Sequence, residues 1–502
     1  MAYSLTNNLY TSDLYTGDQT RELDRRAIHD HGIQGLTLMK RAGLAAFERA
    51  CVLWPDNRHW LVLCGGGNNA GDGYAFAALA AQRGHRVEVL FMAAPDQLSG
   101  DALTACEEAR QQSVPMRPFD TDAVPPQQAV LVDALLGIGL RTPVRDSVAA
   151  AIHWINASGL PVLALDLPSG LCADSGSELG CAVRATHTLS FITAKVGLYT
   201  GRGPALCGQV AVATLEVPQE AFTGITAAAR RVALPVLLPL LPERAEDIHK
   251  GALGHLMVIG GDLGYGGAAI LAAEAAAMTG AGLVTLATRP EHVTAALVRR
   301  PELMVIGVPS GQELEPHMAR PDVLVVGPGL GRTPWSEQLL QQALQSGQPV
   351  VLDADALNIL AEGRLPLPDH QQWVMTPHPG EAARLLKSTT QEVQNDRVGA
   401  ATKLQKAFGG VILLKGAGTL IADASGVYLA KVGNPGLATA GSGDVLAGLI
   451  GSLMAQGLAP LIAAQLGVCL HGEAADLAVE ETGLAGLQAA ELVPYVRELL
   501  KT

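Results

Sequence analysis

The sequence predicts an α/β protein with at least two domains. Its 502 residues are too many for one ordinary domain. Short apolar runs alternate with glycine-rich loops and small-residue helical segments along most of the chain, as in βαβ units. The composition is 48% hydrophobic and 17% charged with 56 glycines, which suits helices packed closely on parallel strands.

Charge and cysteine content exclude several classes of partner. The net charge is −13 and no run of lysines or arginines occurs, so nucleic acid and anionic membranes are poor candidates as main partners. The seven cysteines are scattered without a CxxC pair, which fits a reducing compartment and argues against disulfides or structural zinc. The first residues show no signal-peptide pattern. We therefore expect a cytoplasmic protein.

The first half opens with a predicted helical region over residues 20–55. A strand over 59–64, a glycine-rich loop over 65–73, a helix over 74–82 and a strand over 86–92 follow. In α/β folds the loop of such a unit is a common place for a ligand.

The glycine-rich loop gives only a weak dinucleotide-binding signal. Gly65, Gly67 and Ala70 fit a loose fingerprint, but no acidic residue is clearly placed at the end of the next strand. Two asparagines and Asp72 make the loop more polar than a plain pyrophosphate turn. We predict a ligand with both hydrogen-bond donors and acceptors.

Charged side chains follow three further predicted strands, over 129–133, 161–166 and 186–192. These side chains are Asp133, Asp166 and Lys195. Because the carboxyl ends of parallel strands meet at one edge of a sheet, we expect a site there.

The α/β pattern breaks over 215–245, where alanine- and proline-rich sequence occurs, and restarts at residue 254. We place the domain boundary near residue 225, which gives domains of 1–225 and 226–502. The second begins with a strand and glycine loop over 254–268 and a helix over 269–279. The two halves share no register-by-register repeat.

Four apolar strands of the second half, starting near residues 323, 349, 374 and 411, each end in a polar glycine- or proline-containing loop. A hairpin-like segment over 419–432 comes next. The polar groups at these strand ends and in the next glycine loop are Asp353, Asp355, Asn358, His378, Glu381, Lys415 and Asp444.

Residues 445–470 carry no charge and are long enough to span a bilayer. Gly457, Pro460 and two glutamines interrupt the segment. We predict two buried helices of a globular core.

The small-residue stretch 433–448 runs into an apolar helix and predicts a phosphate site. Asp444 would hold a cation or take a proton from a hydroxyl that attacks a phosphoryl group. The alternative is an ordinary helix start with Ser442 as N-cap. Lys415 and the glycines after it suit phosphate oxygens but lack Walker A spacing. His378, between two prolines, is either a rigid ligand contact or a structural loop histidine.

Several motifs resemble those of NAD(P)H-hydrate repair enzymes. The segments 434–448 (NPGLATAGSGDVLAG), 376–381 (TPHPGE), 327–331 (GPGLG) and 415–419 (KGAGT) resemble the ADP-dependent NAD(P)H-hydrate dehydratases, a branch of the ribokinase-like fold. The segments 67–73 (GNNAGDG), 132–140 (VDALLGIGL) and 166–170 (DLPSG) resemble the NAD(P)H-hydrate epimerases. The order of the two halves is that of the bacterial bifunctional enzymes, and the resemblance covers nearly the whole chain.

The resemblance implies a Rossmann-like three-layer αβα epimerase domain and a ribokinase-like αβα dehydratase domain. The substrates would be the R and S hydrates of NADH and NADPH (NADHX and NADPHX), in which the nicotinamide ring is hydrated. The first domain would interconvert the epimers. The second would dehydrate the S form, consuming ADP and releasing AMP and phosphate. The resemblance also implies K⁺ in the first domain and Mg²⁺ in the second, and we expect a homo-oligomer.

The same resemblance implies catalytic and binding roles for residues of both domains. Asp444 would be the base, with Asp133 and Lys195 as acid–base candidates of the epimerase. The hydrate would contact Asn68, Asn69, Ala70, Gly71, Asp72, Gly137, Ile138, Gly139, Leu140, Arg141, Thr142, Pro143, Asp166, Ala268, Gly329 and His378. The nucleotide would contact Lys415, Gly416, Ala417, Gly418, Thr419 and Gly443. K⁺ would lie near Asn69, Asp133 and Ser169.

The chain departs from the family pattern at Ala70 and Ala440, where glycine is common. An alanine at 440 would crowd a phosphate only if its φ were positive. Two other functions stay open: a sugar- or vitamin-type kinase of the same fold, and a non-catalytic dinucleotide-binding protein. The attached first domain argues against the kinase, and the intact polar groups argue against a scaffold.

Overall fold

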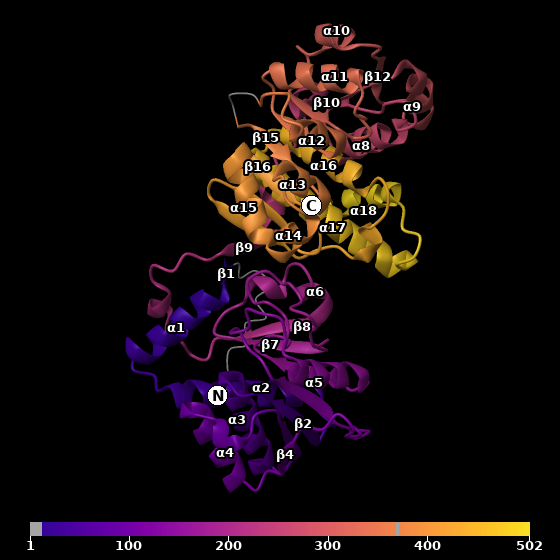
Figure 1. The fold of residues 1–502 in the computed structure, drawn as a ribbon. Coiled ribbons are helices and arrows are strands. Elements are labelled where there is room, and N and C mark those ends of the chain that lie inside the picture. The colour runs from indigo at the N-terminus through magenta and orange to yellow at the C-terminus, as the bar shows by residue number, and fades with distance from the viewer. Residues whose placement is uncertain (1–12, 368–370, 502) are drawn as a thin grey trace. The chain divides into compact units, whose positions relative to one another are not determined.

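The computed structural model describes residues 13–367 and 371–501, and its chain forms two compact units, Met1–Ala229 and Arg230–Thr502 (Figure 1). The break between them falls four residues after the predicted boundary. Each unit has its own sheet with helices packed on it, so each is described by itself.

The first unit is built on a seven-stranded sheet in the order β4-β3-β2-β5-β6-β7-β8, in which all pairs are parallel. The strands are β2 (His59–Cys64), β3 (Arg86–Phe91), β4 (Met116–Pro118), β5 (Val130–Ala134), β6 (Val162–Leu165), β7 (His187–Phe191) and β8 (Gln209–Ala213). The order of the strands reverses between β2 and β5. Open α/β sheets bind ligands beyond the carboxyl ends of strands at such a switch point.

Alternate residues of β2 enter two different cores, which makes the first unit a three-layer αβα structure. Trp60 and Val62 pack with helices on one face, and Leu61 and Leu63 pack with α5 on the other. The helices are α1 (Gly17–His29), α2 (Gly35–Leu53), α3 (Asn68–Gln82), α4 (Gly100–Gln111) and α5 (Asp146–Ala157).

Two helix predictions in this unit need correction. The helical region over 20–55 is two helices, because residues 30–34 break it and Gly32 takes a positive φ of 69°. The helix predicted from residue 74 begins six residues earlier, at Asn68, inside the predicted glycine-rich loop. The predicted strands are confirmed with small shifts of their ends.

The sheet of the second unit runs β9-β18-β17-β16-β15-β14-β13-β10-β11-β12. It is parallel from β16 to β12, and β16, β17 and β18 are antiparallel neighbours. The strands are β9 (Ala229–Val232), β10 (His255–Ile259), β11 (Leu283–Thr288), β12 (Met304–Gly307), β13 (Val323–Val326), β14 (Val350–Leu352), β15 (Trp373–Met375), β16 (Val411–Leu414), β17 (Thr419–Asp423) and β18 (Gly426–Ala430). The predicted hairpin over 419–432 is thereby confirmed.

Helices cover both faces of this sheet. One core joins Leu256 and Val258 of β10 to α8 (Gly266–Thr279), α16 (Ser442–Ala455) and α17 (Pro460–Thr482). Met257, between those two strand residues, is equally buried on the other face. There α11 (Pro334–Gln345) packs on β13 and α15 (Arg397–Phe408) on β16. α8 begins three residues before the predicted start.

The uncharged segment 445–470 forms most of α16 and the first half of α17, so the prediction of two buried helices is confirmed. Within residues 13–367 and 371–501, no helix has the length and hydropathy needed to cross a membrane.

Candidate active sites in the two units

A cavity of about 830 Å³ lies in the first unit, beyond the carboxyl ends of the strands at the switch point. Most of the residues expected to bind the hydrate line it. They are Asn68, Asn69, Asp72, Gly137, Ile138, Gly139, Leu140, Arg141, Thr142, Pro143 and Asp166. Ala70 and Gly71 do not line it, because they face the core from within α3. The loop after β5 and the N-terminal turn of α3 thus line the same cavity.

Gly137 packs closely against Asn69 and lies near Asp166. A Cβ atom at Gly137 would lie 3.3 Å from Asn69 Cβ and 3.7 Å from Asp166 Oδ2. Asn69 Nδ2 donates to the carbonyl of Leu136 at 3.0 Å, whereas Asn69 Oδ1 is buried and has no hydrogen-bond partner among the described residues. A buried oxygen without a donor suits a cation.

Asp133 lies behind this cavity and does not line it. It is fully buried and accepts from the Ser169 hydroxyl at 2.6 Å, from the Ser169 N–H at 2.8 Å and from the Leu135 N–H at 3.2 Å. Burial raises the pKa of Asp133 to about 6, although these hydrogen bonds favour the carboxylate. Asp133 therefore reaches the cavity only through its neighbours.

Lys195 and Asp166 form a buried ion pair at the ends of β7 and β6. Lys195 is fully buried, and its Nζ donates to Asp166 Oδ1, to Ser190 Oγ at 3.0 Å and to the Phe191 carbonyl at 2.6 Å. Burial lowers the pKa of Lys195, although the negative charge of Asp166 acts in the opposite direction. Asp166 has a φ of +68°, a strained conformation for a residue with a side chain, and strain of this kind is common at functional sites.

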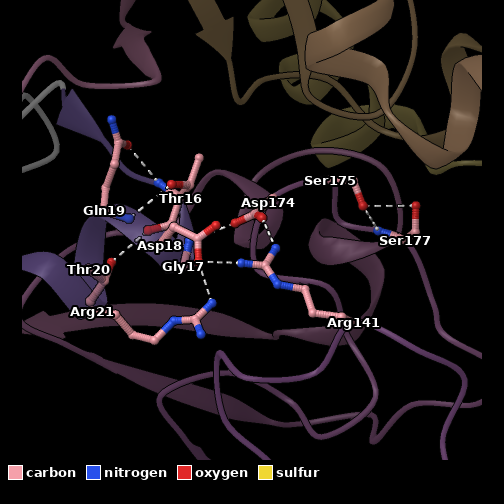
Figure 2. Close-up of polar contacts among 10 residues, drawn as sticks. All are labelled: Thr16, Gly17, Asp18, Gln19, Thr20, Arg21, Arg141, Asp174, Ser175 and Ser177. Carbon is pink, nitrogen blue, oxygen red and sulfur yellow. Dashed lines mark hydrogen bonds and ion pairs between the residues drawn. The ribbon is translucent and has the colours of Figure 1, made fainter.

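Helix α1 forms a wall of the cavity that the sequence did not predict. Figure 2 shows the polar contacts at the start of this helix. Arg141 bridges two carboxylates, donating to Asp18 at 2.7 Å and also to Asp174. Asp174 accepts in addition from the Gly17 N–H at 2.6 Å, and Arg21 donates to Asp18. These contacts fix the start of α1 on the loop that carries Arg141.

Asp444 lies in the first turn of α16, as expected, but Ser442 is not its N-cap. The N-cap is Gly441, whose φ is +90° and which supplies no side chain. Ser442 is buried and its hydroxyl pairs with His471 Nε2 at 3.2 Å. The alternative of an ordinary serine-capped helix is therefore wrong. Burial, together with the charge of Asp353, raises the pKa of Asp444 to about 7.

Lys415, Asp353 and Gly443 converge at the start of α16. Lys415 Nζ donates to Asp353 Oδ1 at 2.7 Å, and the Thr376 hydroxyl donates to the same oxygen at 2.7 Å. A Cβ atom at Gly443 would lie 3.2 Å from Lys415 Nζ. Burial disfavours the Lys415 cation, but the surrounding carboxylates outweigh burial and raise its pKa. A lysine cation beside a helix N-terminus is a site for an anion.

Arg397, which the sequence did not point to, holds the loop from Lys415 to Thr419 by hydrogen bonds to its backbone. Arg397 is 1% exposed, and its guanidinium donates to the carbonyls of Leu414 at 3.3 Å and Lys415 at 3.2 Å. Gly416, with φ +138°, and Ala417 are exposed at the tip of the loop. The loop carbonyls are thus engaged by Arg397 while its tip faces outward.

His378 is both a helix cap and a half-exposed side chain. Its Nδ1 accepts from the Gly380 N–H at 3.0 Å at the start of α13 (Pro379–Leu385), and its Nε2 lies 3.3 Å from Glu381 Oε1. Burial lowers the pKa of His378, which keeps the ring neutral at pH 7. Burial also raises the pKa of Glu381 to about 7.

A second cavity, of about 530 Å³, adjoins these strand ends. Its lining residues are Asp262, Leu263, Tyr265, Arg289, Gly331, Arg332, Thr333 and Asp355. Gly329 and Ala268 lie at its edge, since a Cβ atom at Gly329 would lie 3.0 Å from Tyr265 Cβ and 3.1 Å from Ala268 Cβ. Asp355 accepts from the Gly331 N–H at 2.9 Å and also raises the pKa of Asp444, after burial and Asp353. Asp355 therefore belongs both to the lining of this cavity and to the charged surroundings of Asp444.

Comparisons with known proteins match both halves of the chain. A family model described as NAD(P)H-hydrate dehydratase matches residues 256–497, and one described as YjeF-related protein N-terminus matches residues 35–197. The chain is 46% identical to the bifunctional NAD(P)H-hydrate repair enzyme Nnr of Coxiella burnetii, over 97% of this chain and 99% of that relative. It is 40% identical to the enzyme of the same name from Escherichia coli K12, over 97% and 94%.

Among solved structures, a ribokinase-like superfamily protein of Enterococcus faecalis superposes with a TM-score of 0.51 at 29% identity. The match covers 55% of this chain and 96% of that protein. The predicted fold class and the resemblance read from the motifs are both confirmed. The chain belongs to the family of bifunctional NAD(P)H-hydrate repair enzymes.

Proposed function

We propose that the first unit epimerises the R and S hydrates of NADH and NADPH, and that the second dehydrates the S form at the expense of ADP. Membership of the repair-enzyme family supports both activities. The observation that carries the second is the cluster of Asp444, Lys415 and Asp353 at the start of α16, where a base and a cation meet a helix N-terminus.

In the dehydratase, Asp444 takes the proton of the ring hydroxyl while the hydroxyl oxygen attacks the β-phosphorus of ADP. AMP leaves, and the hydroxyl becomes a phosphate ester, which is a much better leaving group. The lone pair of the ring nitrogen then expels phosphate, and loss of a ring proton gives NAD(P)H. The pKa of Asp444, near 7, suits a base that works at neutral pH.

The nucleotide is held at Lys415, Gly416, Ala417, Gly418, Thr419 and Gly443, and the hydrate at Ala268, Gly329 and His378. The Lys415 cation near Gly443 supports the first assignment, and the adjoining 530 Å³ cavity supports the second. Mg²⁺ would be bound mainly through the nucleotide phosphates, because the described residues contain no group of three or more His, Cys, Asp or Glu side chains fit for a metal.

In the epimerase, the hydrate occupies the 830 Å³ cavity against Asn68, Asn69, Asp72, Asp166 and the loop from Gly137 to Pro143. Ala70 and Gly71 lie buried in α3 and position Asn68, Asn69 and Asp72 for the hydrate. The orphaned Asn69 Oδ1 fits a K⁺ ion, for which oxygen ligands are the suitable type, with Asp133 and Ser169 beside it. Because Asp133 lies behind the cavity, we assign it to holding Ser169 and the ion, and assign the proton transfer to Lys195 through Asp166.

Repair of chemically hydrated NADH tests the function. The hydrate is incubated with the protein and ADP, and the absorbance of the reduced nicotinamide is followed. We expect full recovery of NADH. No recovery with either ADP or ATP contradicts the dehydratase. Phosphorylation of a free sugar or vitamin hydroxyl by ATP supports the kinase alternative, and binding without turnover supports a scaffold.

The chain would act on small molecules as a cytoplasmic homo-oligomer. Light scattering of the purified protein tests the oligomeric state, and fractionation of the source cells tests the location.

A further inference from the structure

One face of α1 closes the epimerase cavity. Thr20, Arg21, Asp24 and Ile28 line the cavity at the three- and four-residue spacing of a helix face. Leu23 and Ala27 are fully buried beside them, and the Thr20 hydroxyl pairs with the Thr193 hydroxyl at 2.7 Å. The side chains of this face are therefore presented by a fixed element.

Asp24 is the carboxylate that this face directs into the cavity. It is half-buried, and among the described residues it has no hydrogen bond or ion pair. Asp18 and Glu22 of the same helix, by contrast, are paired with arginines. An unpaired, partly desolvated carboxylate costs stability and contributes nothing to packing.

The electrostatic surroundings of Asp24 favour its protonated form. The charged groups facing the cavity are Arg21, Asp72, Asp101, Arg141, Arg145 and Asp166, with Lys195 behind Asp166. Burial, and then the charges of Asp166 and Asp101, raise the pKa of Asp24. Asp166, in contrast, accepts a hydrogen bond from the buried Lys195 ammonium.

Epimerisation at a carbon that carries a hydroxyl and adjoins the ring nitrogen needs both a proton donor and a proton acceptor. When the donor protonates the hydroxyl, the C–O bond breaks, water leaves and the nitrogen lone pair forms a C=N bond. Water then adds to the other face of the ring and gives a proton to the acceptor. No net proton is consumed, and either group takes either role in the reverse direction. Two carboxyl groups that line one cavity, one unpaired and the other hydrogen-bonded to a lysine, can supply a donor and an acceptor.

Resting on the proposed epimerase function, we propose that Asp24 is the second catalytic acid–base group, working across the cavity from the Asp166–Lys195 pair. Asp24 donates to the departing hydroxyl, and Asp166 accepts from the incoming water.

The test uses full-length variants and three measurements. The first is interconversion of the purified R and S hydrates without ADP, followed by proton NMR and corrected for the uncatalysed rate. The second is dehydration of the S hydrate with ADP, which reports on the other unit of the same chain. The third is the pH dependence of epimerase kcat/KM. The variants are Asp24→Asn and Asp24→Glu, with Glu22→Gln as the matched control on the solvent side of α1.

For Asp24→Asn we expect epimerase kcat to fall by about 10²- to 10⁴-fold, with KM and the dehydratase rate unchanged. The alkaline limb of the kcat/KM profile should disappear, because that limb reports the loss of the Asp24 proton. Asp24→Glu should recover part of kcat and the limb, and Glu22→Gln should behave as wild type.

Wild-type epimerase kcat in Asp24→Asn overturns the inference, and so does a lower kcat with an unchanged pH profile, which marks a structural role. Absence of epimerase activity in the wild type overturns the proposed function instead. The two failures are therefore distinguishable.

Discussion

At the scale of single residues, the fold changes the chemistry of two carboxyl groups by burying them. Asp444 is surrounded by Asp353 and Lys415, and its pKa rises to about 7 because burial and the Asp353 charge outweigh the lysine. Asp133 is buried more deeply but keeps three hydrogen-bond donors, and its pKa is raised to about 6. Asp444 is partly exposed, whereas Asp133 is fully buried.

Replacing Asp444 with asparagine should abolish dehydration without loss of folding. We expect dehydratase kcat to fall by about 10²- to 10⁴-fold, the usual contribution of a general base. The melting temperature should stay the same or rise, since Asp444 repels Asp353. Steady-state kinetics with the S hydrate and ADP, together with a thermal melt, check both points. Retention of the full rate would exclude Asp444 as the base.

The pH dependence of the dehydratase should follow the same carboxyl group. A base works only in its ionised form, and Asp444 is ionised only above about pH 7. The kcat/KM of the dehydratase should therefore rise as the pH increases through 7 and level off above it. A profile that is flat from pH 5 to 8 would contradict this assignment.

In the glycine-rich segment 433–448, the backbone conformation differs between the neighbouring residues Ala440 and Gly441. Ala440 has no positive φ, so its alanine is compatible with the backbone there, whereas Gly441 has a φ of +90° and a Cβ would lie 2.6 Å from Leu271 Cδ1. Ala440→Gly should change stability by less than about 1 kcal/mol, and Gly441→Ala should destabilise the second unit by more. Denaturant unfolding of the two variants measures the difference. Equal stabilities would mean that a side chain at position 441 causes no strain.

At the scale of elements, side-chain hydrogen bonds fix the start of α1 beside the epimerase cavity. A Thr16–Gln19 capping box starts the helix, and Asp174 joins its first N–H to Arg141 (Figure 2). These bonds attach the start of α1 to the loop from Gly137 to Pro143, which carries Arg141.

Removing the Asp174 carboxylate should therefore weaken the epimerase and leave the dehydratase intact. In Asp174→Ala the α1 start loses one acceptor and Arg141 loses one of its two partners, at a cost of about 1–3 kcal/mol. We expect the epimerase KM to rise severalfold through a looser cavity wall. Initial rates of both reactions test this, and Asp146→Ala on α5 serves as the surface control. A rise of KM in the dehydratase as well would point to a general loss of structure.

At the scale of the whole molecule, the two sites lie in separate compact units, and the product of one reaction is the substrate of the other. The epimers are small and diffusible, so covalent linkage is not needed for the chemistry.

Two half-active chains should therefore complement each other. Asp166→Asn alone should recover only the S part of a mixed hydrate beyond the uncatalysed rate, and Asp444→Asn should recover none. An equimolar mixture of the two should restore full recovery of NADH absorbance. A mixture that repairs no more than Asp166→Asn alone would show that the hydrate must pass between sites within one chain.

The sequence by itself determined the α/β class, most strands, the hairpin and the family, because these follow from hydrophobic periodicity, from glycine positions and from the motifs of the two halves. It also indicated that Asp133, Asp166, Lys195 and Asp444 lie at or near strand ends. Only the tertiary structure decided which of them face a cavity. Asp133 lies behind Ser169, Lys195 reaches the cavity through Asp166, and Asp24 of α1 enters from a helix with no glycine motif. A position at the end of a strand fixes the edge of the sheet, but packing against distant segments fixes where the side chain points.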